Sequence, residues 1–331
     1  MARALALMSG GLDSTLAAKV ILDQGIEVTG LCFRSAFFGT KNAEKMAAQI
    51  GIPLKIVDFT DEHLAMTKNP KHGYGKNMNP CIDCHAMMLK YAGKIMEEEG
   101  YDFLITGEVL NQRPMSQNYK SLEIVKEESG YEDKILRPLS ALNLPPTQME
   151  LSGMVDRSKL LGFSGKTRKP QMALAKQLGI VEYPSPAGGC SLTEPNFAAR
   201  LKDLYDHDKE NTSVHDVRLL RVGRHFRLTD KAKAISTRNE EEYKALKELI
   251  TDDMIIFDTA EHKGSTVALI TAKGHEVTKE EIELTASIAA RYSKARDEES
   301  VLVKYKKPKD AEYEFVRVKP ADDEELKNLM L

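Results

Sequence analysis

A short glycine-rich segment near the start of the chain has the composition of an anion-binding loop. It consists of Ser9, Gly10, Gly11, Leu12, Asp13 and Ser14, between a predicted strand at residues 2–8 and a predicted helix at residues 12–24. Two glycines let the backbone turn sharply and bring its N–H groups close to an anion, and a helix start adds partial positive charge. A plain turn with Asp13 or Ser14 as N-cap is the alternative interpretation. The position directly after the first strand favours a phosphate-binding loop.

Three of the four cysteines have a spacing that could bind a metal or carry sulfur. Cys81 and Cys84 lie three positions apart at the start of a predicted helix, and Cys190 follows a Pro-Ala-Gly-Gly stretch that could bring it to the pair. Three thiols suit an iron–sulfur cluster with one open iron, because such clusters prefer thiolate ligands. Zinc completed by His72 or His85 is the alternative, as is a redox pair.

Composition and charge limit the classes of protein to which the chain can belong. The 331 residues include 47 Lys and Arg, 50 Asp and Glu, and only four Cys, for a net charge of -3. Four cysteines are too few for a disulfide framework, and no apolar run approaches the ~20 residues of a membrane-spanning helix. The apolar start at residues 4–8 is too short for a secretory signal. We therefore expect a cytoplasmic protein that has no membrane partner and is not basic over its whole surface.

The pattern of apolar residues predicts two domains, at residues 1–195 and 196–331. The first alternates strands and helices, which predicts an α/β fold with a doubly wound parallel sheet, and the second predicts a smaller α+β domain. Further strands are expected at residues 26–33, 54–58, 103–106, 134–136, 217–222, 267–271, 300–305 and 314–318. Helices are expected at residues 42–50, 82–99, 114–128, 240–250 and 279–295, and a polar loop at 60–80, where His63 is interpreted as solvated.

Ligands of parallel sheets bind at the carboxyl ends of the strands, which singles out a few residues of the first domain. Cys32 and Phe33 end the second strand and are expected near the bound nucleotide, although Cys32 is also typical of a small core residue. Gly107 and Glu108 follow the fourth strand, where a substrate or nucleotide should bind.

Residues 9–14 resemble the SGGxDS pyrophosphate loop of the PP-loop, or N-type ATP pyrophosphatase, superfamily. The resemblance implies an adenine nucleotide alpha hydrolase-like fold and an enzyme that cleaves ATP between its α and β phosphates. Such enzymes typically adenylate a carbonyl oxygen before a nucleophile displaces AMP. The five residues implied to hold the pyrophosphate, with Mg²⁺ neutralising it through Asp13, are Ser9, Gly10, Gly11, Asp13 and Ser14.

Residues 79–84 and the segment from Gly107 to Gln112 resemble the tRNA thiouridylase branch of this superfamily, over roughly residues 1–195. Members carry either a persulfide-forming cysteine pair or three cysteines that hold a [4Fe–4S] cluster. Cys84 and Cys190 match the paired positions, and Cys81 matches the third ligand. The branch uses its GE-x-x-x-Q region around ATP, which implies that Gly107, Glu108 and Gln112 bind the nucleotide.

Two stretches of basic residues could contact RNA. Residues 157–181 contain six Lys and Arg and no acidic residue, and residues 217–239 contain seven against Asp230 alone. Residues 222–228 resemble the core of the NFACT-R type domain, which is thought to associate with RNA. Residues 201–331 nevertheless hold 24 basic and 28 acidic side chains, so RNA would have to bind through one face.

These observations together favour an ATP-dependent tRNA uridine thiolase. Cys84, Cys190 and Asp13 are its expected catalytic residues, and the cofactors are ATP, Mg²⁺ and a [4Fe–4S] cluster held by Cys81, Cys84 and Cys190. Zinc, or a persulfide with no metal, is the alternative to the cluster. The expected partners are tRNA and a sulfur donor, either sulfide or a persulfide carrier, and a homodimer is left open. The alternative functions are another PP-loop adenylating ligase or amidotransferase with a structural zinc, and a non-catalytic RNA-binding adaptor.

Overall fold

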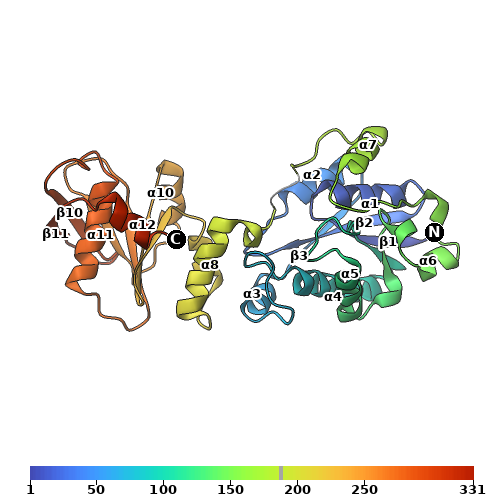
Figure 1. Cartoon of the computed structure of the whole chain (residues 1–331), viewed down its shortest axis with the longest axis horizontal. Coiled ribbons are helices and arrows are strands. Elements are labelled where there is room, and N and C mark those ends of the chain that lie inside the picture. Colours follow the sequence, from blue (N-terminus) through green and yellow to red (C-terminus); the bar gives the residue numbers. More distant parts are fainter. Residues whose placement is uncertain (186–188) are drawn as a thin grey trace. The chain divides into compact units, whose positions relative to one another are not determined.

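The computed structural model describes residues 1–185 and 189–331 and divides into two compact units (Figure 1). Unit 1 is Met1–Glu194 and unit 2 is Pro195–Leu331. Most of the Pro-Ala-Gly-Gly stretch before Cys190, namely residues 186–188, lies outside the described residues. Within those residues, no helix combines the length and the apolar character that crossing a membrane requires.

Unit 1 is built on a five-stranded parallel sheet in the order β3-β2-β1-β4-β5, which confirms the predicted doubly wound α/β fold. The strands are β1 (Arg3–Leu7), β2 (Glu27–Arg34), β3 (Leu54–Asp58), β4 (Phe103–Ile105) and β5 (Ile135–Leu136). The chain begins at the central strand, extends to one edge through β2 and β3, and then returns to β4 on the other side of β1. The carboxyl ends of β1 and β4 therefore flank the point where the strand order reverses, which is the usual ligand site of such sheets.

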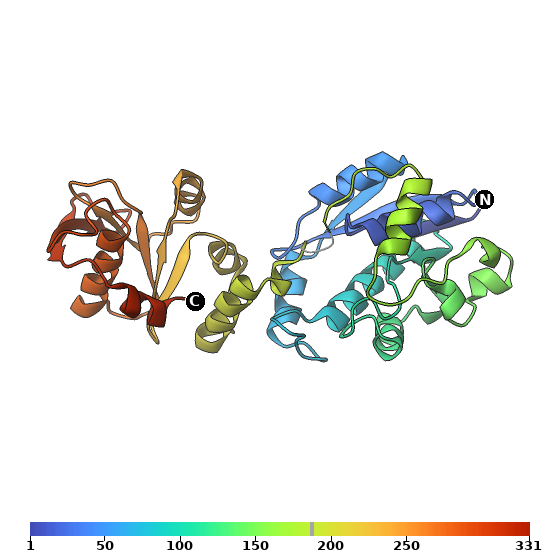
Figure 2. The ribbon, with the colours of Figure 1, turned by 45° about the horizontal axis from the view of Figure 1, so that its top comes forward.

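Helices cover both faces of this sheet (Figures 1 and 2). They are α1 (Leu12–Leu22), α2 (Lys41–Ile50), α3 (Thr60–Lys68), α4 (Cys81–Glu99), α5 (Tyr119–Ser129), α6 (Gln148–Leu151) and α7 (Lys169–Gln177). Alternation along β1 separates two apolar cores, because successive side chains of a strand point to opposite faces. Ala4 and Ala6 pack with residues of α1 and α2, whereas Leu5 packs with residues of α4.

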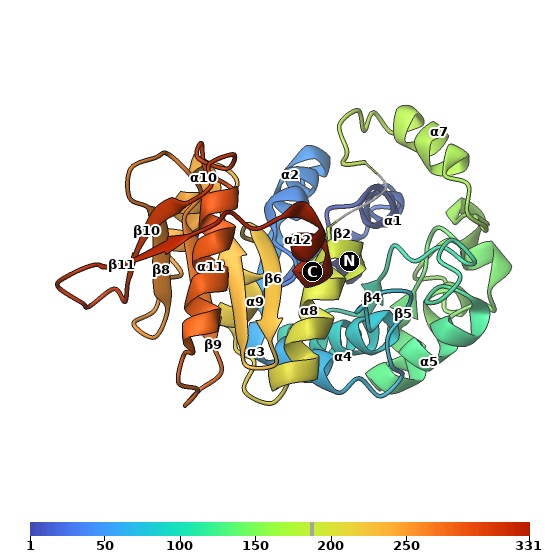
Figure 3. The ribbon, with the colours of Figure 1, turned by 60° about the vertical axis from the view of Figure 1, so that its left-hand side comes forward.

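Unit 2 contains a six-stranded antiparallel sheet in the order β11-β10-β8-β9-β7-β6. Its strands are β6 (Arg224–Thr229), β7 (Ala232–Ser236), β8 (Ile255–Thr259), β9 (Val267–Thr271), β10 (Val301–Lys306) and β11 (Glu314–Val318). Its helices are α8 (Pro195–Asp208), α9 (Val214–Leu219), α10 (Glu240–Lys247), α11 (Lys279–Arg291) and α12 (Asp323–Leu329). Figure 3 shows α11 lying across one face of the sheet, and its alanines and Ile288 are buried there against Phe257 and Val303.

Two predicted elements were wrong, for identifiable local reasons. The segment predicted as a loop at residues 60–80 begins with α3, whose first turn carries Asp61 and Glu62, acidic residues that stabilise a helix start. The strand predicted at residues 217–222 is occupied largely by α9. Ser213 and Asp216 begin that helix with reciprocal side-chain to backbone hydrogen bonds, a capping box. The strands β6, β7 and β8 were not predicted.

The segment that follows β4 lies so close to the glycine-rich loop that only glycine fits at position 107, which can be tested by substitution. A Cβ atom at this position would lie 2.5 Å from the backbone N and Cα atoms of Ser14, which belong to the first turn of α1. We expect Gly107→Ala to lower the free energy of unfolding by roughly 1–3 kcal/mol, because neither backbone segment can move aside freely. Urea unfolding followed by circular dichroism measures this loss.

Gly39→Ala is the matched control, because a Cβ atom at Gly39 would meet no atom within 4 Å. Its unfolding free energy should stay the same or rise slightly through the lower entropy of the unfolded chain. Equal stability of the Gly107→Ala variant and the unmodified protein would contradict the tight packing described here.

Candidate active site

The glycine-rich loop joins β1 to α1 with its backbone N–H groups at the helix start. Gly10 has a φ of 76°, and a Cβ atom there would lie 2.4 Å from the backbone N of Ala43. Only glycine therefore fits this turn. Gly11 is the N-cap residue of α1, and no side chain caps the helix through a hydrogen bond. The first-turn N–H groups are left available to an anion, which is the arrangement that binds phosphate at helix N-termini.

Asp13 is held in a chain of side-chain hydrogen bonds that extends to α7. Gln112 donates from Nε2 to Oδ2 of Asp13 over 2.6 Å, and Gln171 donates to Oε1 of Gln112, also over 2.6 Å. The guanidinium of Arg168 lies 3.8 Å from the same Asp13 oxygen. The other oxygen of Asp13, Oδ1, is buried and has no hydrogen-bond partner among the described residues. A buried carboxylate oxygen of this kind fits a Mg²⁺ ligand, because hard cations prefer oxygen.

Glu108, directly after Gly107, is a buried carboxylate with three side-chain partners. Arg137 Nε donates to Oε2 over 2.9 Å, Thr106 Oγ1 donates to Oε2 over 3.0 Å, and His85 Nδ1 lies 3.1 Å from Oε1. Burial by itself would raise the pKa of Glu108, but the charge of Arg137 and the contacts of His85 outweigh it and lower that pKa to about 2. The carboxylate is therefore ionised and fixed in position, while its predicted contact with nucleotide stays a prediction.

Cys81 and Cys84 lie in the first turn of α4, and the thiols of Cys81 and Cys190 are close enough to Cys84 to influence its pKa. Cys84 is buried, and its pKa is raised well above the usual value, first by burial and then by the neighbouring thiols of Cys190 and Cys81. Cys190 is placed by the residue that follows it, because the backbone N–H and Oγ of Ser191 both donate to the carbonyl of Phe37, over 3.1 and 2.9 Å. Asn79 donates from Nδ2 to Sγ of Cys81 over 3.2 Å.

His63 lies against this group, which corrects its interpretation as a solvated histidine. It is fully buried on α3, its ring stacks on Phe59 at a centroid distance of 4.8 Å, and its Nε2 lies 3.2 Å from Sγ of Cys84. Burial lowers the pKa of His63 to about 4, so the ring is neutral near pH 7. The prediction failed because it placed residues 60–80 in a loop.

Cys32 and Phe33 lie in the cores on the two faces of the sheet. Cys32 is 2% exposed, and burial raises the pKa of its thiol to about 11, with a smaller contribution from Glu44. Phe33 packs on Phe59 at a centroid distance of 4.9 Å. These contacts agree with the core interpretation of Cys32, and contact of either residue with a nucleotide stays a prediction.

Several residues of the site were missed by sequence reasoning. Arg137 follows the predicted strand at residues 134–136, so the strand-end rule applied to Gly107 would have found it. Arg168 was counted only as part of a basic stretch. Gln171 carries no recognisable signal, because an isolated glutamine on a helix is usually exposed.

The type and placement of the three cysteines show how well an iron–sulfur cluster would fit this site. Their residue type is the one that such clusters use, and the pKa of Cys84 is raised first by burial and then by the other two thiols. In the arrangement described for residues 1–185 and 189–331, no group of three or more His, Cys, Asp or Glu is placed to hold a metal ion. The cysteines thus fit a cluster by donor chemistry, without a preformed metal site.

A continuous set of contacts connects the glycine-rich loop to the thiols. Gly107 lies against the backbone of Ser14, Glu108 follows Gly107, and His85, which contacts Glu108, is the neighbour of Cys84 in α4. The glycine-rich loop and the Cys84 thiol are therefore positioned by the same strand end. This arrangement can bind a nucleotide and present a thiol within one domain.

Two known families match separate parts of the chain. Residues 1–144 match the family described as thiamine biosynthesis protein (ThiI), and residues 223–330 match the family described as NFACT protein RNA binding domain. The first match covers the glycine-rich loop, Cys81, Cys84 and Glu108. Cys190 lies beyond the first match and before the second.

Similar curated proteins are tRNA-thiolating enzymes by name. The chain is 35% identical to a tRNA-specific 2-thiouridylase of Syntrophotalea carbinolica over 118 residues, which are 31% of this chain and 33% of that relative. It is 29% identical to the corresponding protein of Cutibacterium acnes over 224 residues, 61% and 57% of the two chains. A tRNA sulfurtransferase of Desulfurococcus amylolyticus is 26% identical over 272 residues, 79% and 50%. The chain thus spans between 33% and 57% of the length of these relatives.

Among solved structures, a 4-thiouridine synthetase–RNA complex with bound ATP has 19% sequence identity and a TM-score of 0.34. The similarity covers 54% of this chain and 52% of that one.

The Glu108–Arg137 ion pair generates a stability prediction. Glu108→Gln removes one charge and leaves the Arg137 guanidinium, whose side chain is 5% exposed, buried without its counter-charge. Breaking a buried pair in this way costs roughly 3–5 kcal/mol of unfolding free energy. Combining Glu108→Gln with Arg137→Met should recover most of the loss, and urea unfolding of the four proteins measures the coupling. Purely additive losses in the double variant would contradict the ion pair.

The contribution of the Glu108 carboxylate to the free energy of unfolding should also depend on pH, in a direction that its pKa determines. The pKa of Glu108 in the folded protein, about 2, lies below its ordinary value of 4.5, so ionisation stabilises the folded state above pH 4.5. That contribution is lost as the pH falls from 4.5 through about 2. The stability difference between the unmodified protein and the Glu108→Gln variant should therefore be constant near neutral pH and shrink in acid. A difference that grows in acid would contradict this assignment.

Proposed function

We propose, from the premise that unit 1 is a ThiI-type PP-loop domain and unit 2 carries an NFACT-type RNA-binding domain, that the chain is an ATP-dependent tRNA sulfurtransferase that thiolates uridine. The observation that carries the proposal is the contact path from Ser14 through Gly107, Glu108 and His85 to Cys84. It joins a phosphate-binding loop to a sulfur-bearing group. The names of the curated relatives support the same reaction.

The glycine-rich loop supplies the nucleotide half of the reaction. The N–H groups at the start of α1 bind the β and γ phosphates of ATP, and Asp13 Oδ1 is the oxygen that would ligate the accompanying Mg²⁺. Gln112 and Gln171 fix the Asp13 carboxylate, so it does not have to reorient when ATP binds. Binding of the phosphates orients the α-phosphorus for attack.

The chemistry proceeds through an adenylated uridine. A uridine carbonyl oxygen forms a bond to the α-phosphorus of ATP, and the bond from that phosphorus to the bridging oxygen breaks and releases pyrophosphate. Sulfur then attacks the activated carbon, the carbon–oxygen bond breaks, and AMP leaves with the original uridine oxygen. Adenylation is needed because the carbonyl oxygen is otherwise a poor leaving group.

The three cysteines supply the sulfur half. Cys81, Cys84 and Cys190 would hold a [4Fe–4S] cluster, which when bound offers one open iron to a hydrosulfide. His63 keeps the Cys84 side chain in place through the contact of its Nε2 with Sγ, and Phe59 stacks on the His63 ring and keeps water away. In the alternative without metal, a persulfide on Cys84 or Cys190 donates sulfur, a disulfide forms between the two, and a thiol reductant restores them.

The proposed reaction is tested with the full chain and unmodified tRNA. With ATP, Mg²⁺ and sulfide under anaerobic conditions, we expect nucleoside mass spectrometry to detect a thiouridine and chromatography to detect one AMP for each thiouridine formed. Omission of ATP is the control and should abolish the product. AMP formation without any thionucleoside would instead indicate an adenylating ligase, and RNA binding without ATP consumption would indicate an adaptor. The same mass spectrometry on tRNA from cells with and without the gene tests the reaction in vivo.

The role of the thiols has its own prediction. Anaerobically purified protein should contain iron and absorb broadly in the visible range, and Cys81→Ala, Cys84→Ala and Cys190→Ala should each lose both the absorbance and thiouridine formation. Thermal unfolding of each variant controls for loss of the fold. Stoichiometric zinc without iron would contradict the cluster. Thiolation that survives Cys81→Ala, but not the other two substitutions, would assign the persulfide route.

A further inference from the structure

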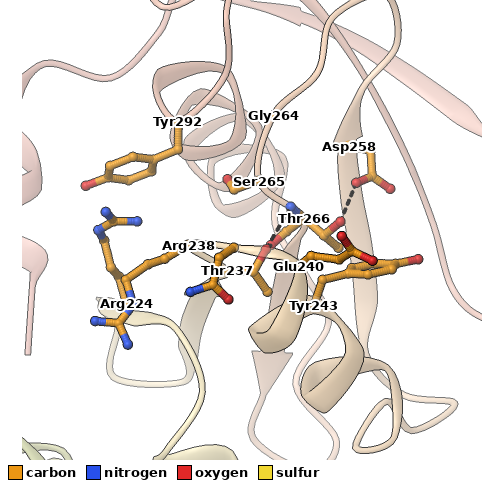
Figure 4. Close-up of a pocket in the computed structure, with 11 residues that line it drawn as sticks. Arg224, Thr237, Arg238, Glu240, Tyr243, Asp258, Gly264, Ser265, Thr266 and Tyr292 are labelled. Atoms are coloured by element: carbon orange, nitrogen blue, oxygen red, sulfur yellow. Dashed lines mark hydrogen bonds between the residues drawn. The ribbon is translucent and has the colours of Figure 1, made fainter.

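Unit 2 contains a pocket at one end of the strands of its antiparallel sheet (Figure 4). The pocket has a volume of about 620 Å³ and is formed where β6 begins, β7 ends, β8 ends and β9 begins, so loops of four strands meet there. Tyr292, at the end of α11, closes one side. The residues that line the pocket are Arg224, Thr237, Arg238, Asn239, Glu240, Tyr243, Asp258, Gly264, Ser265, Thr266 and Tyr292.

One side of the pocket presents a cation stacked on an aromatic ring. The guanidinium of Arg224 lies 4.5 Å from the centre of the Tyr292 ring. No ion pair to Arg224 is present in the described part of the chain, whereas Arg238 beside it pairs with Glu242. Figure 4 shows both arginine side chains on the side of Tyr292. A guanidinium with no carboxylate partner is a strong donor for a phosphate, since it presents a planar fork of N–H groups.

The opposite side presents hydrogen-bond acceptors and a second ring. Asp258 accepts a hydrogen bond from Thr266 Oγ1 over 2.7 Å through Oδ1, and within the described part of the chain its Oδ2 accepts none. Figure 4 shows Asp258, Glu240 and Tyr243 on this side, across the pocket from Tyr292. Ser265 accepts from Ser236 over 3.0 Å, which leaves the Ser265 hydroxyl proton free to bond a ligand. The pocket therefore combines an anion-binding side with a side whose carboxylates can accept hydrogen bonds from neutral donors.

The walls of the pocket are fixed by close backbone packing. A Cβ atom at Gly264 would lie 2.7 Å from Cβ of Ser293, and one at Gly223, which precedes Arg224 and has a φ of 71°, would lie 2.5 Å from the carbonyl oxygen of Ser236. Both loops thus require glycine at these positions. A rigid pocket loses little entropy when it binds a ligand.

We propose that this pocket binds one unpaired nucleotide of an RNA, with a phosphate on Arg224 and the base between the aromatic side chains and the acceptors of the opposite wall. A nucleotide carries an anion at one end and, on a base, N–H donors and a flat face at the other. Sequence-tolerant binding of single strands combines these two contacts, a cation for the backbone and an aromatic ring for the base. A paired nucleotide cannot enter such a pocket, because its base is stacked and bonded inside the helix. The inference rests on the RNA-binding part of the proposed function.

Fluorescence anisotropy with the full chain tests the proposal. The probes are a labelled single-stranded RNA and a blunt-ended RNA duplex with the same number of phosphates, and ATP is omitted so that the assay does not depend on unit 1 chemistry. We expect the single strand to bind more tightly than the duplex. Arg224→Ala should weaken single-strand binding about tenfold, and the slope of log affinity against log salt should fall in magnitude by about 0.7, the contribution of one phosphate contact.

Two further variants separate specific binding from general charge. Arg317→Ala removes an equal charge from an exposed position on β11, outside the pocket, and should change affinity less than twofold. Arg224→Lys keeps the charge but loses the planar stack on Tyr292, and it should recover only part of the affinity. Thermal unfolding of each variant shows whether it folds.

Three outcomes would overturn the proposal. Equal losses in Arg224→Ala and Arg317→Ala would mean that only net charge matters, and unchanged affinity in a folded Arg224→Ala variant would mean that the pocket does not contact RNA. Saturable binding of GMP or CMP that depends on Arg224, without RNA binding, would assign the pocket to a free nucleotide. Thiolation is measured separately, so loss of pocket binding with retained thiolation, or the reverse, distinguishes this inference from the proposed function.

Discussion

The buried pair between Glu108 and Arg137 is the contact on which the candidate active site depends. Two charges with nearly no solvent are tolerated only when each satisfies the other, and here Arg137 bonds Glu108 directly while His85 and Thr106 occupy the remaining carboxylate positions. The pair joins the ends of β4 and β5, and His85 carries the connection to the first turn of α4. The orientation of the helix that bears Cys81 and Cys84 is thereby coupled to the strand end that supports the glycine-rich loop.

The glycine-rich loop and the Cys84 thiol lie in opposite electrostatic surroundings, one polar and positive and the other apolar. Around the glycine-rich loop, the positive elements are backbone N–H groups and Arg168, and Asp13 keeps one carboxylate oxygen that has no hydrogen-bond partner among the residues the structure describes. Around Cys84 the surroundings are apolar and aromatic, which raises the pKa of the thiol and lowers that of His63. A thiol in such surroundings stays protonated until a positive charge or a metal stabilises the thiolate. Sulfur chemistry at Cys84 therefore requires a partner that the apolar wall itself does not provide.

Local sequence patterns predicted the fold of unit 1 and singled out its glycine-rich loop and its cysteines, because these signals are contiguous. The run of residues 9–14 and the Cys81–Cys84 spacing can each be recognised without knowing what lies opposite. Gln171 and His63 could not be found in this way, since each matters only through a contact with a residue distant in sequence, Gln112 and Cys84 respectively. In unit 2 the pattern of apolar residues at 217–222 led to a wrong strand prediction, because it suits either a strand or the buried face of a helix. The capping box at Ser213 favours the helix that the structure shows there.

The ion pairs of unit 2 determine which of its arginines are available to bind a phosphate. Arg227 pairs with Asp203 and Arg238 pairs with Glu242, so two of the seven basic residues at 217–239 are neutralised within the fold. A domain with more acidic than basic side chains cannot hold RNA through a broad positive field. Its affinity must then come from a few cations that carboxylates leave available, placed next to rings on which a base can stack. Arg224 on Tyr292 meets that requirement, because no ion pair among the described residues offsets its charge and its guanidinium already lies over an aromatic face.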